Sequence, residues 1–161
     1  MDEILEILTK DARTSSSEIA KMTNKSEEEV KKIISRYEKD GTILKYKALL
    51  NPDKVSENKG LVRAWIEVNI IPERGVGFDS IAERIYKFDE VKNCYLLAGR
   101  YDLLLLVEGE SLHDVAGFVA KKLSTLESIT KTATHFLLKV YKENGDIMLA
   151  PEKAERLPVT P

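Results

Sequence analysis

Three consecutive glutamates open a charged segment, Asn24–Gly41, that continues with basic residues. Carboxylates in the first turn of a helix stabilise its positive end by about 0.3–1 kcal/mol each. A carboxylate in this place can instead accept a hydrogen bond from cytosine N4 in the major groove of DNA. Glu27 and Glu28 are the candidates for base contact, because the spacing of Ser26 and Glu29 predicts that Glu29 closes a capping box. The sequence leaves both interpretations open.

Basic residues around the same segment have the chemistry to bind DNA phosphates. Each neutralised phosphate adds a slope of about 0.9 to the logarithmic salt dependence of binding, so several contacts together are measurable. A single lysine is more often a solvated surface residue, and the hypothesis therefore concerns the set. The residues assigned to DNA binding are Lys25, Ser26, Glu27, Glu28, Lys31, Lys32, Ser35, Arg36, Lys45 and Lys47.

The elements that would position these residues are short helices. Ser15 and Glu18 have the spacing of a capping box, and a second box starts at Ser26. Between the two helices that these boxes begin, Asn24 can adopt the left-handed conformation of a tight turn. Gly41 is a usual helix end. This pattern predicts a three-helix, helix-turn-helix unit, although units of this size also occur as plain packing modules.

The domain organisation follows from changes in pattern along the chain. After the third helix, Thr42–Asn51 alternates apolar and basic residues and is expected to form a short strand, the wing, with Lys45 and Lys47 on one side. Asn51–Gly60 is polar, contains Pro and Gly, and is expected to be a linker. We therefore divide the chain into a helix-turn-helix domain (1–50), a linker (51–60), a second domain (61–145) and a C-terminal tail (146–161).

The second domain alternates strand-like and helix-like patterns. Leu61–Ile71 carries apolar residues at every second position, as a half-buried strand does. The order strand, helix, strand, strand, helix, strand predicts a ferredoxin-like α+β sandwich. Leu103–Val107 is apolar at every position, as in strands that are buried on both faces. A second copy of the sheet is the simplest cover for the open face, which predicts a twofold homodimer.

Composition restricts the class of protein. The net charge is -2, and residues 1–60 hold 12 Lys+Arg against 12 Asp+Glu, which argues against a sequence-blind nucleic-acid coat. A single cysteine, Cys94, excludes an intramolecular disulfide framework and a multi-cysteine zinc site. Apolar runs are far too short for a membrane span, and the N-terminus lacks signal-peptide order. We expect a cytoplasmic protein with no catalytic residues, no metal, no cofactor and no membrane partner.

Several short stretches together resemble the leucine-responsive regulatory protein/AsnC family of transcription regulators. The resemblance covers essentially residues 1–145 and rests on "DAR" (11–13), "SSSEIA" (15–20), Ser26, "YEKDGTI" (37–43), "YKALLN" (46–51) and "GRYDLLL" (99–105). It implies a DNA-binding helix-turn-helix joined to a ferredoxin-like module that dimerises, assembles further into an octamer of four dimers, and binds amino acids. The expected DNA target is a double-stranded pseudo-palindromic operator. Ala12, Asn24 and Glu27–Glu29 depart from the family pattern.

The resemblance also implies an effector site around the segment 97–102. From the residues alone, a tight hairpin would require Gly99, and Asp102 could bond to turn amides. In the family, this loop lines a cleft between dimers, with Asp102 expected to hold the ammonium group and the Gly99 and Arg100 amides to hold the carboxylate. Strand alternation places Thr134 and His135 on opposite faces, so only one of them can belong to one pocket. The residues assigned to this site are Leu97, Ala98, Gly99, Arg100, Tyr101, Asp102, Thr134 and His135.

Two other functions remain open at the level of the sequence. Siroheme decarboxylases share the two-domain outline and use histidines around a tetrapyrrole. The comparable segment here carries Asn93 instead of a histidine, and only His113 and His135 occur in the chain. A ligand-binding assembly protein without DNA affinity is the other alternative, because the front domain is electrically neutral.

Overall fold

The computed structural model describes residues 2–51, 55, 60–72 and 77–148. The chain forms two compact units, Met1–Leu50 and Asn51–Pro161. Most of the expected linker, the segment 73–76 and the tail from residue 149 onward lie outside the described residues.

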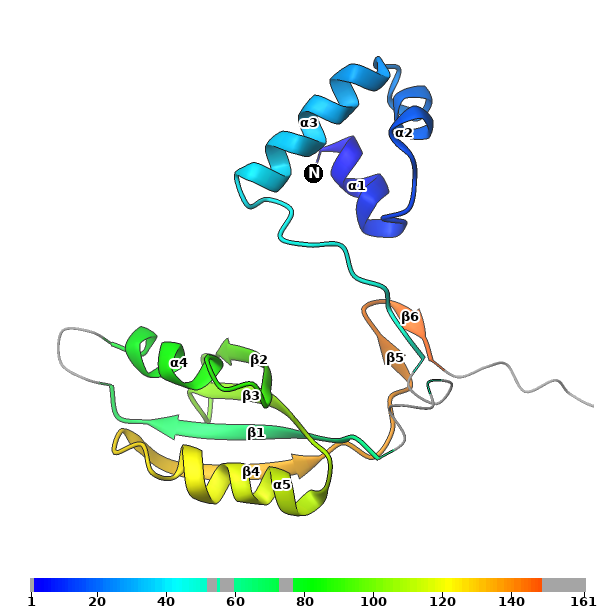
Figure 1. Cartoon of the computed structure of the whole chain (residues 1–161). Helices are drawn as coiled ribbons and strands as arrows, with labels where there is room; N and C mark the ends of the chain where they lie inside the picture. Colours follow the sequence, from blue (N-terminus) through cyan, green and yellow to red (C-terminus); the bar gives the residue numbers. More distant parts are fainter. Residues whose placement is uncertain (1, 52–54, 56–59, 73–76, 149–161) are drawn as a thin grey trace, which may run out of the picture. The chain divides into compact units, whose positions relative to one another are not determined.

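The N-terminal unit consists of three helices, α1 (Glu3–Lys10), α2 (Ser16–Thr23) and α3 (Glu27–Lys39) (Figure 1). The helices enclose a small core of Ile4, Ile19, Ala20 and Val30. Ile7, Leu8, Ile33 and Ile34 pack around this core and remain partly exposed. The three-helix arrangement predicted from the sequence is confirmed.

Both predicted capping boxes are present. At α2, the Ser15 amide donates to Glu18 Oε2 (2.9 Å) and the Glu18 amide donates to Ser15 Oγ (3.2 Å). The same pair of hydrogen bonds joins Ser26 and Glu29 at the start of α3. Asn24 ends α2 with a φ of 52°, the left-handed conformation that the turn requires.

The segment Thr42–Asn51 forms no strand, which corrects the expectation of a short strand there. A strand needs a neighbour for its backbone hydrogen bonds, and the described part of this unit contains no second strand. The chain instead stays at the end of α3, where the Ile43 amide donates to the Tyr37 carbonyl (2.8 Å). The Tyr46 hydroxyl donates to Glu38 Oε1 (3.0 Å).

The second unit has the predicted ferredoxin-like order. Its elements are β1 (Val62–Ile70), α4 (Asp79–Tyr86), β2 (Val91–Leu96), β3 (Leu103–Gly109), α5 (Leu112–Phe118) with a π-helical turn (Val119–Leu123), and β4 (Ile129–Phe136). The strands form an antiparallel sheet in the order β2-β3-β1-β4 (Figure 1). A small hairpin, β5 (Lys142–Glu143) and β6 (Asp146–Ile147), follows.

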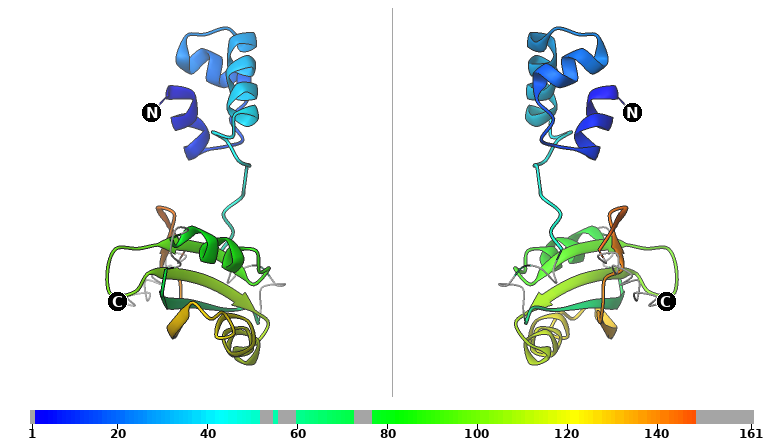
Figure 2. Two further views of the ribbon diagram at one scale, coloured as in Figure 1. Left: turned by 90° about the vertical axis from the view of Figure 1, so that its left-hand side faces the viewer. Right: turned by 90° about the vertical axis from the view of Figure 1, so that its right-hand side faces the viewer.

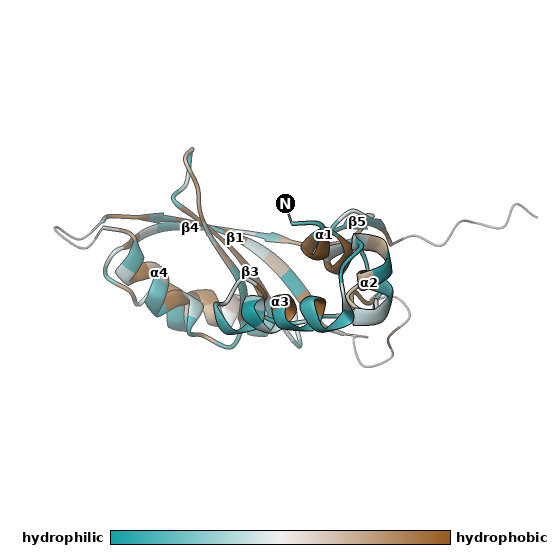
Figure 3. Cartoon of the chain, turned by 90° about the horizontal axis from the view of Figure 1, so that it is seen from above, coloured by the Kyte–Doolittle hydropathy of each residue, from teal (hydrophilic) through white to brown (hydrophobic). Residues whose placement is uncertain are grey.

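Both helices of this unit pack on one face of the sheet. Ile81 and Ile85 of α4 and Val115 and Phe118 of α5 share one core with the inward residues of the strands. Figure 2 shows the sheet and its helices from the two sides, and Figure 3 shows β1 and β4 in one layer with α4 in another. The opposite face carries no helix among the described residues.

The apolar run in β3 divides between the two faces. Leu103, Leu105 and Val107 are fully buried against the helices, whereas Leu104 and Leu106 lie half-buried on the open face. Trp65 is the cross-strand partner of Leu106, and its ring stacks with that of Tyr95 at a centroid distance of 6.4 Å. The open face therefore has an aromatic and aliphatic centre, as the run of leucines predicted.

Replacing Leu105 by Ala is expected to lower the free energy of unfolding of this unit by about 2–5 kcal/mol, because it leaves a cavity in a packed core. The single tryptophan, Trp65, lies in the same sheet, so its fluorescence in a urea titration reports on this unit. Leu138→Ala is the matched control, since Leu138 is 95% exposed and its truncation should change stability by less than about 0.5 kcal/mol. Equal losses in the two variants would contradict the assigned core.

Candidate DNA interface and effector loop

Helix α3 has one buried face and one solvent face. Val30 and Tyr37 point into the unit and are buried, which fixes the rotation of the helix about its axis. At 3.6 residues per turn, the residues farthest from this buried side recur at intervals of four and three positions. They form what we call the outward stripe, which consists of Glu28, Lys32, Ser35 and Lys39.

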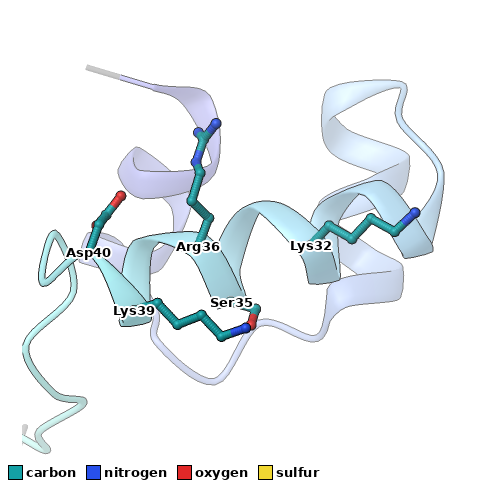
Figure 4. Close-up of a pocket in the computed structure, with 5 residues that line it drawn as sticks. All are labelled: Lys32, Ser35, Arg36, Lys39 and Asp40. Atoms are coloured by element: carbon teal, nitrogen blue, oxygen red, sulfur yellow. The ribbon is translucent and has the colours of Figure 1, made fainter.

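A shallow hollow on α3 gathers basic residues. Its walls are Lys32, Ser35, Arg36, Lys39 and Asp40 (Figure 4). Figure 4 shows the Lys39 side chain extending along Ser35, while Arg36 points away from them. The Arg36 guanidinium lies 5.0 Å from the centre of the Tyr37 ring. Three cations and one carboxylate give this end of the helix a net positive charge.

Sequence reasoning missed Lys39. The residue lies seven positions after Lys32 and four after Ser35, so the helical spacing that placed those two on one face also includes Lys39. The prediction covered the helix only as far as Arg36, whereas its exposed face continues to the last turn.

The three first-turn glutamates have different environments. Glu27 pairs with Lys31 at 2.5 Å between Oε1 and Nζ. Glu29 accepts hydrogen bonds from the Ser26 amide and hydroxyl (both 2.9 Å), and these bonds lower the pKa of its carboxyl below 4.5. Glu28 has no hydrogen-bond or ion-pair partner among the described residues. The structure thereby separates one free carboxylate from two engaged ones.

The remaining predicted DNA contacts differ in how they are placed. Lys25 and Ser26 lie in the exposed turn between α2 and α3. Lys45 and Lys47 are exposed on the unpaired segment after α3, on either side of Tyr46, whose hydroxyl bonds to α3 at Glu38. The structure thus brings Lys32, Ser35 and Arg36 together, and it does not place Lys45 and Lys47 on a wing strand.

The loop 97–102 joins β2 to β3 and is anchored on β1. The Leu97 amide donates to the Asp102 carbonyl (2.8 Å), and the Asp102 amide donates to the Val68 carbonyl (3.0 Å). Asn69 Nδ2 donates to the Arg100 carbonyl (3.0 Å). Between these anchors the residues Leu97, Ala98, Gly99 and Arg100 are exposed, while Tyr101 and Asp102 are half-buried.

Glycine is not required at position 99 by the turn. Gly99 does not have a positive φ, and a Cβ built on it would meet no atom within 4 Å. This corrects the expectation of a tight hairpin that demands glycine, because the connection spans six residues instead of two. The space above Gly99 is open in the described chain.

Asp102 has a structural role that accounts for one of its two oxygens. The Ile70 amide donates to Asp102 Oδ2 (2.7 Å), so the carboxylate caps the end of β1. No described residue bonds to Oδ1. The expected bond to a backbone amide is present, but it reaches the neighbouring strand instead of the turn itself.

Thr134 and His135 point to opposite faces of the sheet. Thr134 is the cross-strand partner of the buried Ile66, on the helix-covered face. His135 is the partner of Trp65, and its Nε2 lies 3.2 Å from Glu67 Oε1 on the open face. Asp102 bonds to β1 at Val68 and Ile70, on the side of β3, whereas Thr134 and His135 pair with β1 on its other side, at Ile66 and Trp65. A single chain therefore does not bring either residue to the loop.

Comparison with known proteins places the two units in one family. The model of the Lrp/AsnC ligand-binding domain matches residues 63–147, and a model of winged helix-turn-helix DNA-binding domains matches residues 3–43. The chain belongs to the Lrp/AsnC family. It is a DNA-binding transcriptional regulator with a ligand-binding domain, as the resemblance predicted.

Two relatives and one solved structure illustrate the similarity. An HTH-type transcriptional regulator of Bacillus subtilis, YugG, is 46% identical over 99% of this chain and 95% of its own. The HTH-type transcriptional regulator LrpA of Pyrococcus horikoshii is 30% identical over 86% of this chain and 94% of its own. A transcriptional regulator of Neisseria meningitidis in complex with L-methionine is 26% identical, with a TM-score of 0.69 over 88% of this chain and 89% of its own. These names favour a regulator over the tetrapyrrole enzyme.

No helix in the described part of the chain is long and apolar enough to cross a membrane. No three His, Cys, Asp or Glu side chains of that part of the chain are grouped so that they could hold a metal ion.

The capping glutamate of α3 predicts a pH dependence of stability. The pKa of Glu29 is lower in the folded protein than in the unfolded chain. The ionised carboxylate therefore stabilises the fold fully above about pH 4.5, and this stabilisation is lost as the pH falls through the pKa of the folded state. Glu29→Gln can keep the capping hydrogen bond but cannot titrate. We expect the variant to lose less stability than the wild type on acidification below pH 4.5, as measured by circular dichroism at 222 nm in urea titrations.

Glu28→Gln is the control for this experiment, since it removes a carboxylate of the same turn that accepts no capping hydrogen bond. It should keep the full acid sensitivity of the wild type. If Glu29→Gln and the wild type lose the same stability below pH 4.5, the capping bond does not contribute to the pH dependence.

Proposed function

We propose that this regulator reads a pseudo-palindromic operator with the outward stripe of α3 and responds to an amino acid bound at the loop 97–102. The observation that carries the first half is the arrangement of charge on α3. Lys32 and Lys39 are exposed, lie on the side opposite the core, and have no carboxylate partner among the described residues. They are therefore available to phosphates.

Several features support α3 as the recognition helix. Its 13 residues extend about 20 Å, a length that fits the major groove. Ser35 adds a hydroxyl between the two lysines, and Arg36 and Lys25 flank the stripe. Lys31 is the weaker candidate for phosphate binding, because it already pairs with Glu27. Binding DNA would require that pair to open or to rotate together.

The loop 97–102 supports an amino-acid effector by its complementary charges. An amino acid carries an ammonium group and a carboxylate, and Asp102 Oδ1 offers an unengaged acceptor for the first. The Gly99 and Arg100 amides donate to no acceptor in the described residues, so they are available to the second. The Neisseria relative, in complex with L-methionine, supports this class of ligand.

A homodimer is the form in which we expect the protein to act in the cytoplasm. The open face exposes Trp65, Tyr95, Leu104 and Leu106 at its centre, and the pair Arg63–Glu108 (2.7 Å) lies at its edge. A second copy of this face would cover it, and two helix-turn-helix units would then match two half-sites. Further association, up to four dimers, could supply Thr134 or His135 to the loop of a neighbour.

The double variant Lys32→Ala/Lys39→Ala is expected to weaken binding to the DNA upstream of the protein's own coding sequence. Each lost phosphate contact should reduce the slope of the logarithm of affinity against the logarithm of salt by about 0.9. Fluorescence anisotropy with labelled DNA at several salt concentrations measures both quantities. Lys121→Ala, an exposed lysine of the second unit, is the control and should leave the slope unchanged. An unchanged slope in the double variant would contradict the proposed interface.

Asp102→Asn tests the ammonium site. The amide oxygen of Asn can still accept from the Ile70 amide, so the fold is preserved while the negative charge is removed. We expect the affinity for the effector to fall at least about tenfold, as for the loss of a charged hydrogen bond. Calorimetric titration with each of the twenty amino acids, L-methionine first, measures the change. Glu110→Gln, an exposed carboxylate elsewhere, should bind as the wild type does.

Two results would contradict the effector proposal. One is that none of the twenty amino acids binds the wild-type protein. The other is that Asp102→Asn binds an amino acid as tightly as the wild type.

A further inference from the structure

Glu28 is the one acidic residue of the outward stripe. It occupies the second position of α3, next to the exposed turn, and its neighbours on the stripe are Lys32 and Ser35. In helix-turn-helix proteins, the residues near the N-terminus of the recognition helix contact base edges. Glu28 therefore lies where a base-reading side chain is expected, if α3 is the recognition helix.

The two neighbouring glutamates lie off the outward stripe, and each already has a contact within the chain. Glu27 is engaged with Lys31, and Glu29 is held by Ser26 in the capping box. If the Glu29 side chain turned toward a base, the Ser26 amide would lose its acceptor and the helix would lose part of its capping box, which destabilises it. Of the two candidates from the sequence, Glu27 and Glu28, the structure leaves only Glu28 with an unengaged carboxylate among the described residues.

The freedom of Glu28 is not explained by a lack of possible partners. Glu28 and Lys32 have the same i, i+4 spacing and the same favourable order, acid before base, as Glu27 and Lys31. The Glu27–Lys31 pair is closed, whereas no ion pair joins Glu28 to Lys32. Both side chains of the stripe thus remain available to a ligand at the same time.

The chemistry of the groove decides what a carboxylate can bind there. A carboxylate close to DNA phosphates is repelled, so it is tolerated at a base edge only where it accepts a hydrogen bond. Cytosine N4 has an acceptor on one side only, O6 of the paired guanine, whereas adenine N6 lies between two acceptors, its own N7 and thymine O4, which repel a carboxylate. Lys32, one turn farther along, can neutralise a nearby phosphate and so reduce the repulsion.

We propose that Glu28 determines sequence specificity by accepting a hydrogen bond from cytosine N4 at one C·G pair in each half-site. This inference rests on the proposed function, because it requires α3 to lie in the major groove. It goes further by naming the residue and the base that it reads.

The test is selection of randomised double-stranded DNA by the full-length protein, with Glu28→Gln, Glu28→Ala and Glu27→Gln selected in parallel. The wild type and Glu27→Gln should both enrich one invariant C·G pair per half-site. Glu28→Ala should lose the preference at that position alone, and Glu28→Gln should lose it or shift it toward A·T, because Gln pairs with adenine. In titrations, replacing that C·G pair should weaken the wild type about tenfold or more and leave Glu28→Ala within about twofold.

A second readout separates base reading from a purely structural role. Removing a carboxylate near the phosphates should raise the affinity of Glu28→Ala for non-specific DNA, whereas damage to the helix would lower it. If Glu28→Gln and Glu28→Ala select the same consensus as the wild type, the inference is wrong and the proposed function stands. If the wild type enriches no DNA sequence, the operator-binding proposal fails and the inference fails with it.

Discussion

The orientation of α3 is the constraint on which the proposed DNA interface depends. Burial of Val30 and Tyr37 fixes the rotation of the helix about its axis, and the capping box of Ser26 and Glu29 fixes the residue at which the helix begins. With 3.6 residues per turn, a rotation equivalent to one residue would move every outward side chain by 100°. The hydrophobic contacts and the cap together therefore determine which of the many charges in this helix face solvent. Neither contact involves DNA, yet both determine which side chains the proposed interface presents.

A corresponding constraint in the second unit is the position of β1 between β3 and β4. Because β1 pairs on both sides, its alternation sets the faces of both neighbours, and it places Trp65 opposite Leu106 on one side and His135 on the other. The same strand holds the loop 97–102, through the Ile70 and Val68 backbone groups that bond to Asp102. A ligand that altered the Asp102 contact would act directly on the central strand of the sheet. The loop and the open face are therefore connected by one continuous element.

The sequence was sufficient wherever local chemistry decides the structure. The capping boxes, the left-handed Asn24 and the strand alternation that separates Thr134 from His135 were all readable from residue types and spacing. It was insufficient wherever a choice between equivalent partners was required. Glu27 and Glu28 each have a lysine four positions later, and spacing cannot tell which pair closes. The prediction of a strand at Thr42–Asn51 was wrong for a related reason, because alternation predicts a strand but says nothing of whether a partner strand exists.

Net charge is a poor guide to this protein because contacts within the chain decide which charges are free. Exposed ion pairs such as Glu27–Lys31 contribute little to stability, typically about 0.2–1 kcal/mol. The opposite charges of such a pair largely cancel each other for a partner at a distance. Glu18 and Glu29 are engaged by capping serines, whose hydrogen bonds lower the pKa of each carboxyl. Asp40 accepts from the Thr42 amide.

The outward stripe carries one carboxylate at its start and two lysines beyond it, so a neutral unit presents a polar, mostly positive face. The charge pattern of this face arises from which residues the helix turns outward, and composition alone cannot reveal it.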